Sequence, residues 1–321
     1  MQLRKNNSSQ LKDLRCTVFG ANGFIGSNLC TALYAGGAQV KGVGRSLKIR
    51  QELAEKIEWH SFDLTSDEDV FSIIKDTDVV IHLVSTLLPA ASNLDKVRDI
   101  QENLLTTVKI LDSCRFANVK KFIYASSGGT IYGPQEIMPI NENTLLAPIC
   151  SYGIVKASVE NYLRLYRHLY AFDYFALRIA NPYGPNQMPK DQGLIAALIN
   201  KALKDETIEI WGDGSVVRDY IYIDDLVSAI IKSITLDDQA APRTYNIGSG
   251  VGRSVNSVLD TISKLHDKKL DVKYHPVRSV DVPKNVLDIK QANNWLGWQP
   301  TNDWEPSVQK TYQWQENKYF L

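Results

Sequence analysis

The chain of 321 residues contains no run of about 18 apolar residues, so no segment is long enough to cross a bilayer as a helix. Its first 14 residues are polar and have no apolar stretch typical of a signal peptide, and we expect a cytoplasmic protein. With 36 basic and 36 acidic residues the net charge is zero, and no block of Lys or Arg indicates binding to nucleic acid or to a membrane surface. This composition fits an enzyme that acts on small molecules.

Cysteine and histidine are scarce and scattered. The four cysteines contain no Cys-x-x-Cys pair, which indicates neither a disulfide framework nor a zinc site, so we expect buried thiols. The five histidines show no His-Glu-x-x-His spacing, and no metal site is predicted. Internal repeats and low-complexity tracts are also missing, so a solenoid is not expected.

The first 180 residues alternate short β-rich runs with helical patterns, which is typical of a parallel sheet covered by helices. Residues 79–84 are almost all apolar, as expected for a strand that is buried on both faces. We therefore predict a doubly wound α/β sheet, with helices that include Ile100–Ala117 and Tyr152–Phe172. The predicted strands are Cys16–Phe19, Gln39–Val43, Glu58–Phe62, Val79–Val84, Lys121–Ala125 and Tyr174–Ile179.

Loops and shorter elements follow residue 181, with breaks at Asn-Pro-Tyr-Gly-Pro, Trp-Gly-Asp-Gly and Gly-Ser-Gly. The length exceeds that of most single domains. We predict an irregular lead over residues 1–14, a dinucleotide-binding domain over 15–180, and a smaller α/β substrate domain over 181–321 whose elements can interleave with the first. In this last part we expect helices at Gly193–Leu203, Asp225–Ile234, Val255–Leu265 and Ile289–Leu296, and a strand at Val272–His275.

Three glycines, at positions 20, 23 and 26, follow a predicted strand and open a predicted helix. Bare backbone amides and the positive end of the helix dipole can hold a pyrophosphate at such a turn. A three-glycine loop alone is weak evidence, but the strand before it and the amphipathic residues 24–33 after it favour a dinucleotide site. The loop residues predicted to bind the cofactor are Gly20, Asn22, Gly23, Phe24, Ile25 and Gly26.

The end of the second predicted strand bears on the choice between NAD and NADP. Proteins specific for NAD usually place an acidic residue there to bind the ribose hydroxyls, and this chain has Gly44 and Arg45 instead. Gly44 leaves space and Arg45 offers a bidentate cation, which suits the 2′-phosphate of NADP. The alternative role for Arg45 is a surface ion pair. We expect NADP(H) in preference to NAD, with Asp63 near the adenine amino group and Leu64 next to it.

Tyr152 and Lys156 are four residues apart in a predicted helix, so their side chains project from the same face. A nearby cation favours phenolate and lowers a phenol pKa that is normally about 10. A lower pKa brings proton exchange with a sugar hydroxyl within reach of neutral pH. Together with the glycine loop, this pair predicts hydride transfer to or from a nicotinamide.

Three motifs, Gly-x-x-Gly-x-x-Gly, Tyr-x-x-x-Lys and Ser-Ser-Gly-Gly-Thr-Ile-Tyr-Gly at 126–133, together resemble the extended short-chain dehydrogenase/reductase family. Within it the chain is similar to the nucleotide-sugar branch typified by UDP-glucose 4-epimerase. The likeness runs from about Cys16 to Glu305 and includes the segments 178–185, 218–220 and 278–281.

The resemblance implies a Rossmann-type fold, a nucleotide sugar bound between the two domains, and a homodimer formed through the helices at 100–117 and 152–172. It places Val84 and Asn103 at the cofactor, together with Tyr152 and Lys156. The residues that it implies at the substrate are Ser127, Tyr152, Asn181, Arg218, Arg278 and Asp281.

One position departs from the family pattern. Many relatives carry Ser or Thr four residues before the tyrosine of the Tyr-Gly pair at 132–133, where this chain has Gly128. Ser127 and Thr130 are the neighbouring hydroxyls, and we favour Ser127 as the catalytic partner of Tyr152 and Lys156. Dehydratases of the branch place Asp-Glu after their Thr, and the two glycines at 128–129 make dehydration unexpected.

Two catalytic interpretations remain open, both with hydride transfer at C4 of the sugar. Arg45 and the missing acidic residue narrowly favour an NADPH-dependent reductase of a dTDP- or UDP-linked 4-keto-6-deoxyhexose. The motif likeness favours the alternative, a UDP-hexose 4-epimerase that keeps its cofactor bound. A remote alternative is a dinucleotide-binding sensor without catalysis, because such a protein needs only the glycine loop.

Overall fold

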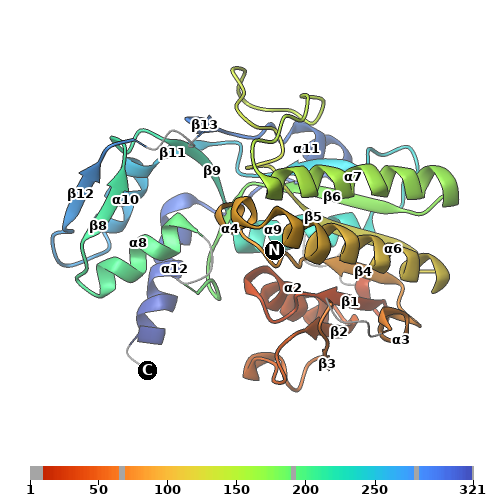
Figure 1. Ribbon diagram of the computed structural model, residues 1–321. Helices are drawn as coiled ribbons and strands as arrows, with labels where there is room; N and C mark the ends of the chain where they lie inside the picture. The colour runs from red at the N-terminus through yellow and green to blue at the C-terminus, as the bar shows by residue number, and fades with distance from the viewer. Residues whose placement is uncertain (1–9, 65–68, 189–192, 278–281, 320–321) are drawn as a thin grey trace.

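The structure, a computed structural model, describes residues 10–64, 69–188, 193–277 and 282–319, and its largest element there is a seven-stranded sheet (Figure 1). The strand order is β10-β6-β5-β4-β1-β2-β3, and each neighbouring pair is parallel. The predicted Rossmann-type α/β fold is confirmed. The strands are β1 (Arg15–Phe19), β2 (Gln39–Gly44), β3 (Glu58–Ser61), β4 (Val79–His82), β5 (Lys121–Ser127), β6 (Tyr174–Ile179) and β10 (Thr244–Ile247).

The six predicted strands of this sheet all occur, with ends that differ by at most two residues. The seventh, β10, was not predicted. It comes from beyond residue 181 and pairs with β6 at the edge of the sheet. A four-residue strand has too short a pattern to be distinguished from a loop, because its pairing partner lies far away in the sequence. The division into domains at residue 180 stays a prediction.

The order of the strands in the sheet reverses at β1. From β1 the chain passes to β2 on one side, and β4 lies on the other side, so the strand order reverses at this point. In open α/β sheets ligands bind at the carboxyl ends of the strands where the order reverses. The glycine loop follows β1, and residues 83–88 follow β4 at the same edge.

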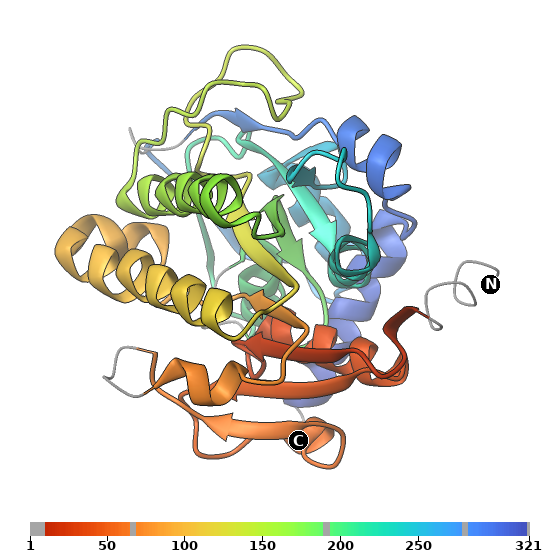
Figure 2. The same cartoon turned by 90° about the vertical axis from the view of Figure 1, so that its right-hand side faces the viewer.

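Helices cover both faces of the sheet (Figures 1 and 2). On one face α7 (Ser151–Tyr170) packs against α6 (Thr106–Phe116), which also contacts α3 (Val70–Ile74). On the other face α2 (Phe24–Ala35) packs against α9 (Ile223–Thr235). The predicted helix at 100–117 is longer than expected: it begins in α5 (Lys96–Asp99), continues through a π-helical stretch, η2 (Ile100–Leu105), and ends with α6. A short helix, α4 (Pro89–Leu94), precedes it.

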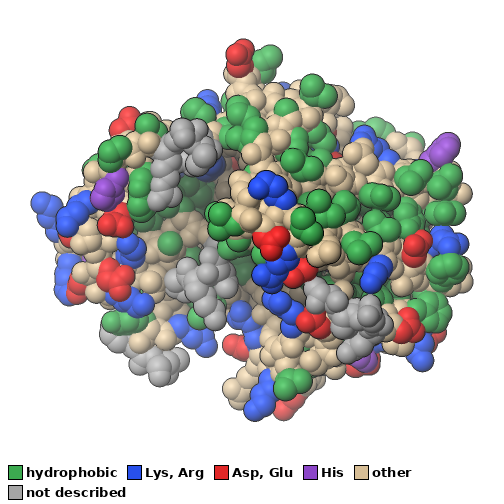
Figure 3. Space-filling model, in the orientation of Figure 1, with side chains coloured by type: hydrophobic (Ala, Val, Ile, Leu, Met, Phe, Trp, Pro, Cys, Tyr) green, Lys and Arg blue, Asp and Glu red, His purple; other side chains and the backbone are tan. Residues whose placement is uncertain are grey.

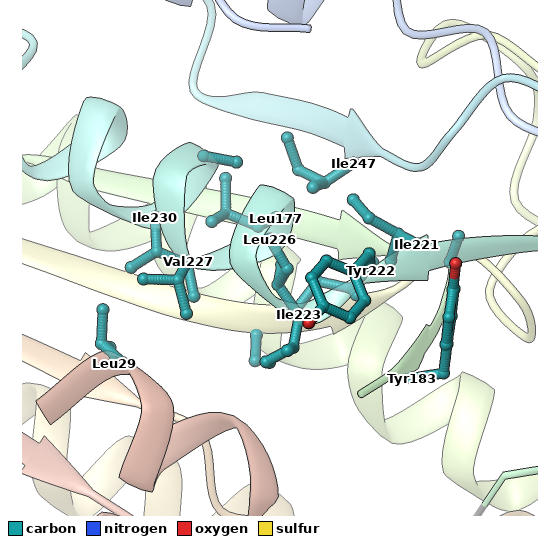
Figure 4. Close-up of a cluster of buried hydrophobic side chains, with 14 of the residues drawn as sticks. Leu29, Leu177, Tyr183, Ile221, Tyr222, Ile223, Leu226, Val227, Ile230 and Ile247 are labelled. Atoms are coloured by element: carbon teal, nitrogen blue, oxygen red, sulfur yellow. The ribbon is translucent and has the colours of Figure 1, made fainter. Parts of the chain in front are cut away.

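The core between α2, α9 and the sheet joins distant parts of the chain. Figure 4 shows Leu226, Val227 and Ile230 of α9 lying between Leu29 of α2 and the side chains of β6 and β10. These aliphatic side chains are buried. Burying each one stabilises the fold by about 1.5–3 kcal/mol, so α9 belongs energetically to the larger sheet although it follows residue 181.

The smaller part of the structure is built on two further sheets. β9 (Val217–Tyr222) pairs with β7 (Asn181–Tyr183), β11 (Gly252–Ser254) and β13 (Lys284–Asn285), and β8 (Ile208–Trp211) pairs with β12 (Val272–His275). The predicted helices and the strand at 272–275 occur, whereas α12 and the strands β7, β8, β9, β11 and β13 were not predicted. The helices are α8 (Leu194–Leu203), α10 (Val255–Ser263), α11 (Lys290–Leu296) and α12 (Trp304–Tyr319). Within the described residues, no helix has both the length and the apolar character that crossing a membrane requires.

Candidate functional site

The glycine loop has the geometry of a phosphate cradle. Gly20 adopts φ of +87°, which side chains disfavour, and its amide donates to Val43 O at 2.9 Å. A Cβ at Gly26 would overlap the carbonyl oxygen of Gly20, so only glycine lets α2 begin this close to the loop. The N-cap, Gly23, offers no side-chain acceptor to the first turn of α2. The amides of that turn are therefore available to an anion such as a pyrophosphate.

Two further predicted cofactor residues line the loop. A Cβ at Gly20 would lie 3.3 Å from Val84 Cγ2, which places Val84 against the glycine turn. The amide of Asn22 is used internally: Asn22 Oδ1 accepts from the Arg50 amide at 3.0 Å, and Nδ2 donates to Lys48 O at 3.2 Å. Asn22 thus braces the segment after β2. Direct cofactor contacts of Asn22, Phe24 and Ile25 stay predictions.

The space expected at Gly44 is occupied. A Cβ at this position would lie 2.8 Å from Trp59 Cη2, so the missing side chain makes room for the indole ring. Trp59 Nε1 also donates to Ser46 O at 3.2 Å and covers this end of β2. Arg45 is exposed. At the end of β3, Asp63 is exposed and Leu64 is half-buried.

Tyr152 and Lys156 lie together, as their spacing predicts. Tyr152 is in the first turn of α7, and Lys156 Nζ lies 5.4 Å from the centroid of its ring. The ammonium also lies 4.7 Å from the centroid of the Tyr124 ring and donates to Ala125 O at 2.8 Å. Burial lowers the pKa of Lys156 to about 8, against the opposing effect of the Asp99 and Glu160 carboxylates.

The expected effect of Lys156 on the phenol is wrong for the chain alone. Burial raises the pKa of Tyr152 to about 12, and the hydrogen bond with Ser85 offsets only part of this change. The ammonium of Lys156 is directed to a backbone carbonyl, while the phenolate would lose hydration in this site. Desolvation therefore outweighs the nearby cation.

Ser127 is the last residue of β5, two positions after the carbonyl that holds Lys156. Its Oγ accepts a hydrogen bond from Thr130 Oγ1 at 2.9 Å, so the two candidate hydroxyls lie together. A Cβ at Gly128 would lie 2.5 Å from Leu287 Cδ1, which explains why the hydroxyl expected by the family pattern is missing there. Ser126, by contrast, is buried and donates to Glu160 Oε1 at 2.6 Å.

Glu160 and Arg178 form a buried ion pair next to Ser126, which the sequence did not lead us to predict. Glu160 Oε2 lies 2.7 Å from Arg178 Nη2, and both side chains are almost fully buried. Arg178 also donates to the hydroxyl of Tyr132 at 2.8 Å. The signal was present in the spacing, because Glu160 follows Lys156 by four residues on the same face of α7.

Asn103 lies in the π-helical stretch and is half-buried. Its Oδ1 accepts from the amide of Thr86 at 2.9 Å, and its Nδ2 donates to Asp99 Oδ1 at 2.8 Å. Asn103 therefore holds the loop that follows β4. Its expected contact with the cofactor stays a prediction.

The residues implied at the substrate are only partly brought together. Asn181 on β7 and Arg218 on β9 lie on paired strands. Asn181 Nδ2 donates to Asp219 O at 2.8 Å, and Arg218 Nη1 donates to Val282 O at 2.7 Å. The other two, Arg278 and Asp281, lie outside the described residues.

Two features of the smaller part had no signal in the sequence. Asn285 on β13 donates to Gly128 O at 3.1 Å and ties this strand to the turn after β5. An open cavity of about 740 Å³ lies near the end of β8, where Trp211 stacks on His275 with ring centroids 5.4 Å apart. Its lining residues are Gly212, Asp213, Ser215, Tyr274, His275 and Val277.

Figure 3 shows this face of the molecule hollowed between the smaller part and the larger sheet, with basic and acidic side chains along the rim. The described residues contain no group of three or more His, Cys, Asp or Glu side chains that could hold a metal ion.

Comparisons with known proteins agree with this geometry. The model of the NAD dependent epimerase/dehydratase family matches residues 16–248. UDP-glucose 4-epimerase of Mycolicibacterium smegmatis is 32% identical over 314 residues, which cover 95% of this chain and 99% of that protein. The dTDP-4-dehydro-6-deoxyglucose reductase of Escherichia coli is 32% identical over 295 residues, covering 88% and 92%.

A solved structure is similar over the same length. UDP-glucose 4-epimerase of Thermus thermophilus, in complex with NAD, aligns with a TM-score of 0.86 and 29% identity, covering 94% of this chain and 98% of that one. The resemblance to the nucleotide-sugar branch of the short-chain dehydrogenase/reductases is confirmed, and with it an enzyme that uses a nicotinamide dinucleotide. The chain belongs to the NAD dependent epimerase/dehydratase family.

Proposed function

We propose that this protein is a nucleotide-sugar 4-epimerase that acts on a UDP-hexose of the glucose and galactose type. The observation that carries the proposal is the pair Tyr152 and Lys156, with the ammonium 5.4 Å from the phenol ring, beside the carboxyl ends of the parallel strands. The relatives named as a UDP-glucose 4-epimerase and a dTDP-4-dehydro-6-deoxyglucose reductase support chemistry at C4.

The residues present fit a nicotinamide dinucleotide. The glycine loop leaves a cradle that a Cβ at Gly26 would fill, and the open first turn of α2 suits the pyrophosphate. Val84 lies against this loop, and in this proposal Lys156 contacts the ribose. When bound, this cofactor supplies the hydride acceptor and donor.

Tyr152 is the acid/base in this proposal. Its phenolate takes the proton of the C4 hydroxyl when the sugar is oxidised and returns it when the ketone is reduced. Because burial holds its pKa at about 12 in the chain alone, the phenol needs additional positive charge to work near neutral pH. Lys156 supplies part of this charge, and a bound oxidised nicotinamide would add to it.

Ser127 orients the reacting hydroxyl. Thr130 donates to Ser127 Oγ, so the proton of Ser127 is not needed for that bond and can be donated to the sugar oxygen. Ser127 stands at the end of β5, close in sequence to Ala125, whose carbonyl fixes Lys156. The three catalytic groups are therefore Tyr152, Lys156 and Ser127.

NAD, rather than the NADP expected from Arg45, suits this function. The indole of Trp59 lies where a side chain at position 44 would be, so the glycine there is explained without a 2′-phosphate. The family description and the NAD held in the Thermus thermophilus structure also support NAD. A tightly held cofactor is what epimerisation needs, because the same hydride is removed and returned.

The test is direct. Purified protein is incubated with UDP-glucose without added cofactor, and the product is separated by chromatography. We expect UDP-galactose to form, and we expect Tyr152→Phe to reduce its formation by at least about 100-fold while the cofactor stays bound. Turnover that survives in Tyr152→Phe contradicts the proposed role.

A 4-ketoreductase is the second candidate. Arg45 is exposed at the end of β2, and the Escherichia coli reductase is as similar in sequence as the epimerase. For a reductase, NADPH is consumed in equal amount to a dTDP- or UDP-linked 4-keto-6-deoxyhexose, and UDP-glucose is left unchanged. Arg45→Ala then raises the KM for NADPH and not that for NADH.

A homodimer accompanies this proposal. On the outer face of α7, Ile154, Leu165 and Leu169 are 53%, 44% and 55% exposed, and Phe116 of α6 is 63% exposed. The α7 residues recur at helical spacing and form an apolar stripe, which Figure 3 shows over α6 and α7. A second copy of this chain is the expected partner. Light scattering should give twice the monomer mass, and Ile154→Glu with Leu165→Glu should halve it.

A further inference from the structure

Asp99 is a fully buried carboxylate that the proposed mechanism does not use. It is the last residue of α5, and each of its oxygens accepts one hydrogen bond. Oδ1 accepts from Asn103 Nδ2 at 2.8 Å, and Oδ2 accepts from Ser151 Oγ at 2.7 Å. In the described part of the chain, no Lys, Arg or His lies within ion-pair distance of Asp99. Burying a charge in this way is costly, so its surroundings must compensate for it.

The first turn of α7 provides part of this compensation. The N-cap residue, Cys150, makes no side-chain cap, and two residues of α4 replace it. Asn93 Oδ1 accepts from the amide of Ser151 at 2.9 Å, and Ser92 Oγ accepts from the amide of Tyr152 at 3.0 Å. With Asp99 on the Ser151 hydroxyl, α4 and α5 together make three hydrogen bonds to the turn that carries Tyr152. The positive end of the α7 dipole also stabilises the negative charge of Asp99.

The other hydrogen bond of Asp99 leads back to the phenol by a different route. Asn103 holds the amide of Thr86 in the loop after β4. The neighbouring residue, Ser85, lowers the pKa of Tyr152 against the larger effect of burial, and its Oγ donates to Leu87 O at 3.4 Å. Asp99 therefore connects the first turn of α7, through Ser151, to the loop after β4, through Asn103.

We propose that Asp99 is a positioning residue for the Tyr152–Lys156 pair. Asp99 fixes the first turn of α7 against the loop after β4, and its charge balances the ammonium of Lys156. The inference rests on the proposed function in one respect, since its kinetic readouts require Tyr152 to be the acid/base.

The charges around the pair support this role. Lys156 and Glu160 face the site from α7, Asp99 from α5, and the titratable rings of His82 and Tyr124 from β4 and β5, with Cys150 before α7. Burial lowers the pKa of Lys156, and among the charges that oppose this effect Asp99 is the strongest. Asp99 also raises the pKa of Tyr152, after the larger effects of burial and Cys150. Removing its charge thus moves both titrations to lower pH.

The first experiment compares Asp99→Asn with the matched control Asp112→Asn. Asp112 lies on α6 and accepts from Tyr166 at 2.7 Å on the same helix α7, well away from Tyr152. The pH profile of kcat is measured for the holoenzyme, together with an NMR titration of isotopically labelled tyrosine ζ carbons assigned with Tyr152→Phe. For Asp99→Asn we expect the limbs of the profile and the Tyr152 resonance to shift to lower pH by about one pH unit, the order expected when one nearby charge is removed. We expect no shift for Asp112→Asn. If the pH profile of kcat and the Tyr152 resonance of Asp99→Asn do not shift, or if those of the control shift equally, the proposal is overturned.

A second variant keeps the experiment decisive if Asp99→Asn does not fold. Ser151→Ala leaves the charge of Asp99 in place and removes one of its hydrogen bonds. We expect kcat to fall by about tenfold with KM and the pH limbs unchanged, because one hydrogen bond to a charged group contributes about that much. A kcat equal to that of the wild type overturns the positioning role.

The two proposals fail in different ways. If Tyr152→Phe keeps full turnover, the proposed function is wrong, and the tyrosine NMR titration still tests whether Asp99 acts on Tyr152. If Tyr152→Phe abolishes turnover while Asp99→Asn and Ser151→Ala behave as the wild type, the proposed function stands and only the role of Asp99 is wrong.

Discussion

Replacing Gly128 with alanine tests whether Leu287 excludes a side chain from the position where relatives carry a hydroxyl. The added Cβ would lie 2.5 Å and 3.1 Å from the two terminal carbons of Leu287, and 3.0 Å from the carbonyl oxygen of Arg178. Carbon atoms in contact prefer a separation of about 3.5–4.0 Å, so the nearer methyl group would have to move by about 1 Å.

The surroundings resist this movement. The side chain of Leu287 is fully buried, and its amide donates to Asp219 Oδ2 at 3.3 Å, which anchors the backbone. Overpacking a buried site by one methyl group typically costs about 1–3 kcal/mol. We therefore expect Gly128→Ala to lower the free energy of unfolding by this amount, measured by urea denaturation.

Two comparisons make the result specific. In the neighbouring Gly129 a Cβ would meet no atom within 4 Å, so we expect Gly129→Ala to change stability by less than about 0.5 kcal/mol. Leu287→Ala alone should cost about 2–5 kcal/mol, but it removes both methyl groups that clash and leaves only the carbonyl oxygen of Arg178 close to the added Cβ. In that background Gly128→Ala should lose most of its cost, which gives a coupling energy of about 1–3 kcal/mol. Additive effects of the two substitutions, or wild-type stability of Gly128→Ala, refute the reasoning.

Three further predictions concern buried charges. Burial lowers the pKa of His82 from 6.5 to about 3, so below about pH 6.5 the unfolded chain binds a proton that the folded chain does not, and the free energy of unfolding falls as the pH drops. Between about pH 7 and pH 5 the wild type should lose about 2 kcal/mol more than His82→Gln in urea denaturation. Equal losses in the two proteins would contradict this. Glu160→Gln leaves Arg178 buried without its carboxylate and should cost about 3 kcal/mol of unfolding free energy, whereas a cost below about 1 kcal/mol would mean that the pair behaves like an exposed one. Because burial lowers the pKa of Lys156 to about 8, kcat should fall as the pH rises through that value. This fall should be missing in Lys156→Arg, because the guanidinium does not titrate in this range. A fall that persists in Lys156→Arg would be due to another group.

Local spacing was enough to predict much of the fold and part of the site. The strand at 79–84, observed as β4 over 79–82, was predicted because a strand buried on both faces needs an apolar run. The glycines at 20 and 26 were predicted because helix entry at a phosphate loop depends on residues only a few positions apart. The same holds for Tyr152 and Lys156, whose common helix face follows from a spacing of four residues.

Contacts between distant residues decided the rest. Gly44 was interpreted as room for a phosphate, but Trp59 of the next strand lies where its side chain would be. Leu287 of a remote segment lies in the same way against Gly128. The pKa of Tyr152 was expected to fall and instead rises, since desolvation depends on everything packed around the ring and not on one neighbour. The pattern along the chain determined which groups share a helix face or a turn. Only the tertiary structure decided what surrounds those groups, because burial and close packing are set by segments that the sequence places far apart.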